Sequence, residues 1–267
     1  MPRYALTLEI AGSGFHGTQL QPRHRTVVAV FQEALRALDP AWRSLTPCGR
    51  LDAGVDARCW IAHGDSGRDW DPAILIGAIN RHLPPDLAVI RAAQVADDWH
   101  ARYAPHDSTY CYHLVVSPVR PVLDSGHWWL RSLHQPQLLA TCAAWLPGDH
   151  DLRAFAARRG DASDQADGRR RYHHAAWTTT GPDHRPATRH VFHITGDGFL
   201  YRQVRGLVGA MVAVARGNAS PQDFQTAIDH PLQERRIGSI APAIGLCLDH
   251  IRYHDEPAWQ TPAPTTR

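Results

Sequence analysis

Segments with the periodicity of strands and of helices alternate along this chain in an order that few folds accommodate. Alternating apolar and polar residues predict strands, and apolar residues at helical spacing predict helices. The predicted strands cover residues 4–10, 57–63, 87–96, 108–116, 173–179, 190–195 and 247–253, and the predicted helices cover 27–38, 72–80, 135–145, 199–216 and 221–229. This order resembles two split β-α-β units. We therefore predict an α+β fold in which two ferredoxin-like or RNP-like lobes share a mainly antiparallel sheet, with a central cleft that would hold an active site.

The length of 267 residues suits one large domain or two small ones. We expect an N-terminal α+β lobe over residues 1–104 and a C-terminal α+β lobe over residues 105–255. The remaining residues, 256–267, are rich in Pro and Thr and are expected to be disordered. No internal period is strong enough to prove that the lobes arose by duplication.

All 28 basic residues are arginine, although the formal net charge is only +2. Guanidinium groups match phosphates and stack on bases, so clustered arginines suit an RNA partner. A GC-rich coding sequence would also favour arginine over lysine, and both explanations stay open. Between residues 155 and 172 we predict a mobile basic loop, which would either clasp phosphates or stay solvated; it carries Arg158, Arg159, Arg169, Arg170 and Arg171.

Several classes of protein are disfavoured by the composition. The five cysteines contain no C-x-x-C pair, and the 18 histidines include no H-E-x-x-H motif, so we expect no disulfide framework, metal site or zinc ribbon. The N-terminus lacks the apolar core of a signal peptide, and no apolar run reaches membrane-spanning length. The expected protein is soluble and cytoplasmic, with no membrane contact.

One acid stands in an unusual loop. Residues 49–55 read Gly-Arg-Leu-Asp-Ala-Gly-Val, so Asp52 lies between Arg50 and a small, flexible Ala-Gly pair that a substrate can approach closely. A lone aspartate in a loop is usually only a turn residue. Asp52 becomes a candidate catalytic residue because its loop occurs together with four other motifs, at residues 83–86, 99–103, 109–112 and 199–209.

Taken together, these segments resemble the tRNA pseudouridine synthase A family. The carrying motifs are R-L-D-A-G-V, L-P-P-D, W-H-A-R-Y, T-Y-C-Y and F-L-Y-R-Q-V-R-G, and the likeness extends over nearly the whole chain. The resemblance implies an enzyme that isomerises uridine to pseudouridine in the anticodon arm of tRNA without a cofactor. It also implies a homodimer with a basic cleft in each subunit and RNA touching both.

The resemblance further implies roles for individual residues. Asp52 matches the family nucleophile, Arg205 matches the cation that keeps this aspartate ionised, and Tyr110 matches an active-site tyrosine that stacks on the base or aids removal of its C5 proton. Tyr112 is the better candidate for a core tyrosine. RNA binding is expected of Arg50, Arg102, Arg202, Arg158 and Arg159, some of which would brace the gap left by an extruded base.

The chain departs from the family pattern around the expected site. Leu51 stands where threonine is common, Asp56 where histidine is common, and Thr18 where tryptophan is common. Gly206 replaces the asparagine that usually follows the late arginine. An extra acid at position 56 would repel phosphate locally. These departures leave open a paralogue that acts on another RNA or on a free uridine nucleotide, and a non-catalytic RNA-binding protein is a third alternative.

Overall fold

The computed structural model describes residues 1–158, 160, 167–181, 187–231 and 236–262. By internal contacts the chain forms two compact units: unit 1 contains residues 1–107 and those from 248 onward, and unit 2 contains residues 108–247. The expected division placed residues 105–255 in the second lobe. The last strand instead lies mainly in unit 1, so this unit is built from both ends of the chain.

Unit 1 is organised around a sheet whose most buried strand comes first in the sequence. The strand order is β4 (Leu87–Val95), β1 (Arg3–Ile10), β3 (Asp56–Asp65) and β10 (Leu246–Tyr253), with the short β2 (Arg43–Pro47) also on β3. Strand β1 pairs antiparallel with both β3 and β4. Because β1 has a neighbour on each side, its backbone groups are paired. Most of its side chains are buried as well.

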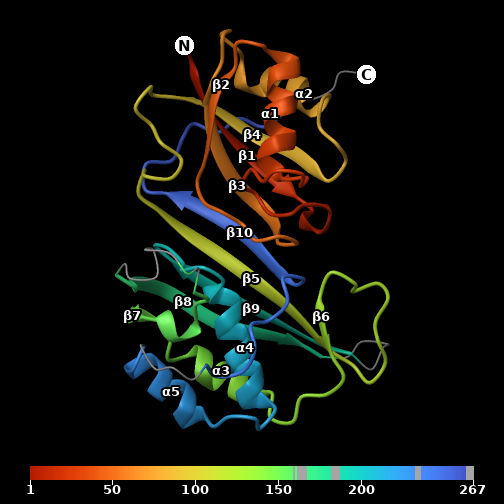
Figure 1. Cartoon of the computed structure of the whole chain (residues 1–267), viewed down its shortest axis with the longest axis vertical. Coiled ribbons are helices and arrows are strands. Elements are labelled where there is room, and N and C mark those ends of the chain that lie inside the picture. The colour runs from red at the N-terminus through yellow and green to blue at the C-terminus, as the bar shows by residue number, and fades with distance from the viewer. Residues whose placement is uncertain (159, 161–166, 182–186, 232–235, 263–267) are drawn as a thin grey trace. The chain divides into compact units, whose positions relative to one another are not determined.

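Two helices pack on this sheet. In α1 (Val27–Leu38), the side chain of Thr26 caps the N-terminus by accepting a hydrogen bond from the Ala29 N–H, as predicted from the sequence. Helix α2 (Pro72–Asn80) begins with a proline and is capped by Asp71. Figure 1 shows α1 and α2 together over the strands of unit 1.

Unit 2 has its own antiparallel strands. The order is β5 (His106–Val116), β9 (Thr188–Gly196), β8 (Arg169–Thr180) and β7 (Gly148–Asp151), and β6 (Trp128–Leu130) pairs parallel with β5. The pairs β5–β9, β8–β9 and β7–β8 are all antiparallel. The predicted α+β class with a mainly antiparallel sheet is thus confirmed.

Helix α4 (Gln203–Ala215) forms the core of unit 2 together with α3 (Gln137–Ala143) and α5 (Pro221–Asp229). Nearly every residue of α4 is buried. Helix α5 begins with a capping box between Ser220 and Asp223. Within the described part of the chain, no helix is both long and apolar enough to cross a membrane.

Each predicted helix and strand has a counterpart in the structure, and the differences at the ends are largest at the start of α4 and the start of β8. Helix α4 begins at 203 and not at 199, because Arg202 adopts a left-handed backbone conformation with φ of 56°. The prediction of a loop through residue 171 is wrong, since the three arginines at 169–171 lie in β8 and pair with β7. Residues 159 and 161–166 lie outside the described residues.

The expected disorder from residue 256 does not hold for residues 256–262. The backbone of Gln260 exchanges hydrogen bonds of 2.8 and 3.1 Å with Ala92 of β4. The indole Nε1–H of Trp259 donates to Glu256 at 2.7 Å, and the guanidinium of Arg91 lies 5.1 Å from the Trp259 ring. This segment covers part of the free edge of β4.

A buried histidine in β3 makes the stability of unit 1 depend on pH. The side chain of His63 is 3% exposed, and its Nδ1 accepts the Ala101 N–H at 3.1 Å. Burial lowers the pKa of His63 to about 4, with a further lowering by the charge of Arg3. The imidazole is therefore a neutral hydrogen-bond acceptor at neutral pH.

We expect acidification to destabilise the protein through this group. The unfolded chain, with a histidine pKa near 6.5, takes up a proton before the folded one, so stability is complete above about pH 6.5 and falls as the pH drops toward 4. His63→Asn keeps an acceptor without a titrating group. Denaturant unfolding should therefore show that the free energy of unfolding falls less between pH 7 and pH 4.5 in the variant than in the wild type, by roughly 2–3 kcal/mol. An equal loss in both proteins would contradict this role of His63.

Candidate active site

Asp52 lies in the short turn between β2 and β3. Its carbonyl oxygen accepts the Val55 N–H at 3.3 Å, and Gly54 has a φ of 77° that favours glycine. The side chains on either side of this turn, Leu51 and Val55, are buried, whereas Asp52 is half-buried. The turn is thus anchored at both ends and presents the aspartate at its surface.

A second segment, residues 12–18, holds this turn in place. The hydroxyl of Thr18 accepts the Leu51 N–H at 3.0 Å, and the Thr18 N–H donates to the Leu51 oxygen at 3.2 Å. Gly17 has a φ of 83°, and a Cβ there would lie 2.7 Å from the Leu51 oxygen. The approach of the two segments therefore requires glycine at position 17.

Asp56 also contributes to this anchoring. Its Oδ1 accepts the Gly12 N–H at 2.7 Å. A Cβ at Gly12 would lie only 2.1 Å from the Val55 oxygen, so glycine is required here too. The sequence suggested that the extra acid would mainly repel phosphate. The structure gives its carboxylate a backbone partner that joins residues 12–18 to the end of the Asp52 turn.

An ion pair extends this framework to the turn at residues 83–86. Arg25 donates to both carboxylate oxygens of Asp86, at 2.7 and 2.8 Å, and to the Gly14 oxygen at 3.1 Å. The hydrogen bond from Arg25 holds the pKa of the Asp86 carboxyl below its usual value. The guanidinium also lies 4.0 Å from the centre of the Phe15 ring. Sequence reasoning singled out the L-P-P-D motif and missed its arginine partner.

In unit 2, Tyr110 lies on β5 opposite Ile194 of β9. Its half-buried ring meets Phe199 edge to face, with 5.1 Å between the ring centres. Tyr112 is fully buried, and its hydroxyl donates to the Pro242 oxygen at 3.0 Å. Burial raises the pKa of Tyr112, as the environment of a core tyrosine would.

Arg205 lies in the first turns of α4 and is half-buried. Its Nε donates to the Ala241 oxygen at 2.8 Å, and the Ala241 N–H donates to the Arg205 oxygen at 3.0 Å. The side chain is therefore tied to the segment that follows Ile240. This anchoring argues against a solvated charge on a helix surface.

Gln203, which sequence reasoning did not single out, orders the start of α4. Its buried amide accepts hydrogen bonds from the Tyr172 hydroxyl and the Leu200 N–H, both at 3.1 Å, and donates to the Leu152 oxygen at 3.3 Å. In the sequence, this role is indicated only by the position of Gln203, a polar residue within an apolar helical stretch. Its neighbour Arg202 is exposed, with the guanidinium 4.9 Å from the Tyr201 ring.

The other predicted RNA contacts are exposed arginines. Arg50 and Arg102 belong to unit 1, with Asp52, whereas Arg158 belongs to unit 2, with Tyr110, Arg202 and Arg205. Arg159 lies outside the described residues. Arg236, by contrast, is half-buried and donates to the Phe155 and Ala156 oxygens; its pKa is lowered by burial and by the charge of Arg158.

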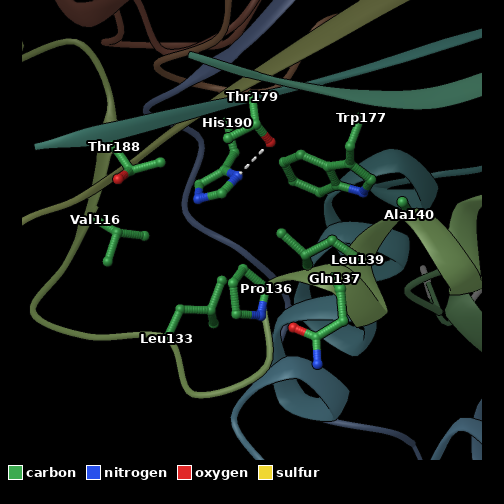
Figure 2. Close-up of a pocket in the computed structure, with 10 residues that line it drawn as sticks. All are labelled: Val116, Leu133, Pro136, Gln137, Leu139, Ala140, Trp177, Thr179, Thr188 and His190. Carbon is green, nitrogen blue, oxygen red and sulfur yellow. Dashed lines mark hydrogen bonds between the residues drawn. The ribbon is translucent and has the colours of Figure 1, made fainter. Parts of the chain in front are cut away.

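A cavity of about 390 Å³ lies elsewhere in unit 2. Figure 2 shows the imidazole of His190 at its wall, bonded to Thr179 at 2.9 Å. The lining is mostly apolar and contains none of the predicted site residues; it consists of Val116, Leu133, Pro136, Gln137, Leu139, Ala140, Trp177, Thr179, Thr188 and His190. Among the residues that the structure describes, no His, Cys, Asp and Glu side chains are grouped as metal ligands would be.

Comparisons with known proteins point to one family. A family model described as tRNA pseudouridine synthase matches residues 142–254. A tRNA pseudouridine synthase A of Cereibacter sphaeroides is 33% identical over 260 residues, which cover 96% of this chain and 99% of the relative. Proteins of the same name from Dinoroseobacter shibae and Paracoccus denitrificans are 32% and 34% identical, each covering 96% of this chain and 98% of the relative.

Proposed function

The chain belongs to the tRNA pseudouridine synthase A family, and from this membership we propose that it isomerises uridine to pseudouridine in tRNA. The proposal rests mainly on the turn at residues 51–55, in which the half-buried Asp52 lies between the buried side chains of Leu51 and Val55. Residues 12–18 hold this turn through Thr18 and Gly12. A binding protein would not need a carboxylate fixed in this manner beside an anionic ligand.

We propose Asp52 as the nucleophile. In the reaction the bond from N1 of uracil to C1′ breaks, a bond from C5 to C1′ forms, C5 loses its proton and N1 gains one. The atoms and electrons balance within one nucleotide, so the isomerisation requires no redox cofactor. An ionised carboxylate is suited to detach the base by attack on the sugar or the base or by promoting elimination, and all three routes use the same aspartate.

We further propose roles for two residues of unit 2. Arg205 supplies the positive charge that keeps the nucleophile ionised. Tyr110 stacks on the target base or helps to remove its C5 proton. Two observations support these assignments: the Arg205 guanidinium is oriented by its bond to the Ala241 oxygen, and the Tyr110 ring is held by a T-shaped contact with Phe199.

RNA binding is proposed for the exposed arginines at positions 50, 102, 158 and 202, and for Arg159. Their charge suits contacts with phosphates, which position a nucleic acid without reading its sequence. The family resemblance also underlies our proposals that the target uridines lie in the anticodon arm and that the protein acts as a cytoplasmic homodimer.

Tritium release from RNA labelled at C5 of uridine tests the proposed function directly. We would compare tRNA transcript, an unrelated RNA and free uridine monophosphate. Release from tRNA alone is the expected result. Release from the monophosphate or the unrelated RNA would favour the specialised paralogue, and binding of tRNA without release would favour a non-catalytic role.

A substitution at Thr18 tests whether the turn must be held in place for catalysis. Thr18→Val removes the acceptor of the buried Leu51 N–H, which should cost about 1–3 kcal/mol of stability. It should also displace Asp52 and lower kcat by roughly ten- to a hundredfold with little change in KM. Steady-state kinetics on tRNA and thermal unfolding measure both effects.

Thr18→Ser is the matched control because it retains the hydroxyl. We expect it to restore kcat to within a few-fold of the wild-type value. If both variants lost kcat equally, the hydroxyl would not be the group that positions the turn.

A further inference from the structure

An aromatic side chain in unit 1 is displayed to solvent on a rigid support. Tyr103 is 74% exposed, which is unusual for so large a ring. One face of the ring is stacked on His100, with 4.3 Å between ring centres and 27° between planes. Because most of the residue is exposed, a further flat group can reach the tyrosine ring from solvent.

The turn that carries Tyr103 is fixed by hydrogen bonds. The Nδ1 of His100 accepts the N–H groups of Arg102 and Tyr103 at 3.1 and 3.3 Å. The buried His63 accepts the Ala101 N–H. Because this backbone is already ordered, a ligand that stacked on Tyr103 would lose little affinity to the ordering of the turn.

A second anchor comes from the end of β10. The Tyr253 hydroxyl donates to the Ala101 oxygen at 2.6 Å. The rings of Trp99 and Tyr253 also pack together, with 5.0 Å between centres. The support of Tyr103 is therefore part of the core of unit 1.

The charges around Tyr103 favour stacking over phosphate binding. Arg102 is exposed, with its guanidinium 5.9 Å from the Tyr103 ring. The exposed acids Asp97 and Asp98 precede the turn and would oppose a cluster of phosphates. An aromatic ring beside a single arginine suits an unpaired nucleobase, because every base has a π-face that stacks on such a pair.

This surface is remote from the proposed nucleophile within unit 1. His63, which contacts the turn, is seven residues into β3 from the end next to Asp52, a span of roughly 20 Å at the rise of a strand. A base on Tyr103 is therefore not the uridine that reacts at Asp52.

We propose that Tyr103, backed by His100, is a stacking site for an unpaired base of the bound RNA, separate from the target uridine. The inference rests on the proposed function, since it takes tRNA as the ligand. Stacking at this site adds to affinity and leaves the chemical step unchanged.

The test compares Tyr103→Ala and Tyr103→Phe in the full-length protein by fluorescence anisotropy with labelled tRNA transcript. We expect alanine to weaken binding by about tenfold and phenylalanine, which retains the ring, to stay within about twofold of wild type. The ratio should be the same at low and high salt, because stacking releases no counterions. Single-turnover tritium release at saturating tRNA should be unchanged in both variants.

Ile74→Ala is a matched control, since Ile74 is an exposed apolar residue of the same unit, at 59% exposure, that is not part of the turn. Unchanged affinity in Tyr103→Ala, or an equal loss in Tyr103→Phe, would overturn the proposal. A change in sedimentation behaviour of Tyr103→Ala would overturn it in favour of contact with a second copy of the chain. Failure of the proposed function is distinguishable, because the wild-type protein would then release no tritium from tRNA.

Discussion

Replacement of Asp52 by asparagine is expected to leave a folded protein that binds tRNA and releases no tritium from C5 of uridine above background. Asparagine has the size of aspartate, and the backbone contacts of the turn, from Val55 to Asp52 and between Thr18 and Leu51, do not involve the carboxylate. The neutral amide is a poor nucleophile, so the rate should fall by about a thousandfold or more. Single-turnover tritium release with a matched tRNA-binding measurement would establish this.

Asp56→Asn is the control for a general effect of charge in this loop. The asparagine oxygen can still accept the Gly12 N–H that Asp56 accepts at 2.7 Å, so the anchoring is retained. We expect activity within a few-fold of wild type. Comparable losses at positions 52 and 56 would argue that the loop needs negative charge rather than a nucleophile at one position.

The second large effect is expected for Gly206→Asn, which installs the residue that the family commonly carries. A Cβ at position 206 would lie 1.7 Å from the Phe155 oxygen at the end of the 3₁₀ helix at Arg153–Phe155. The clash is with backbone, so a rotamer change cannot relieve it and α4 must move. We expect a loss of at least about 3 kcal/mol, which corresponds to a fall in Tm of roughly 6–12 °C.

Gly77→Ala provides the matched comparison for this substitution. Gly77 lies in α2 and is exposed, and a Cβ added there would meet no heavy atom of the surrounding structure within 4 Å. Alanine there should stabilise the helix by about 0.5–1 kcal/mol. Thermal unfolding of both variants separates the general effect of replacing a helical glycine on stability from the effect of the clash with the Phe155 oxygen. A Gly206→Asn protein as stable as wild type would show that the 3₁₀ helix can shift at little cost.

Local sequence patterns predicted the main elements because these elements have periodic apolar faces. Helix α1 is an example: Thr26 marks its start, and Phe31 and Leu35 lie on its buried side. Strands β2, β6 and β7 were missed, since they are three to five residues long and lack a full alternating pattern. The arginines at 169–171 were assigned to a loop because of their charge. Charged side chains are also compatible with a strand near a sheet edge, and these residues pair with β7.

The residues that hold the proposed site were harder to predict than the residues proposed to react. Asp52, Tyr110 and Arg205 are recognisable from motifs. Thr18 and Gly12 act through partners about 33 and 44 residues away in sequence, and no local periodicity records such contacts. Departures from the family pattern at Thr18 and Asp56 were noticed, yet their anchoring contacts with the turn became visible only in the structure.

The division of unit 1 between the two ends of the chain has a consequence for biosynthesis. Unit 2 is one continuous stretch, residues 108–247, whereas unit 1 needs residues translated both before and after it. Strand β10 is translated after unit 2 and is the neighbour of β3, the strand that follows the Asp52 turn. A nascent chain therefore carries an incomplete unit 1, the unit that contains Asp52, until β10 has been translated, so a chain that terminates before β10 would lack a strand of this unit.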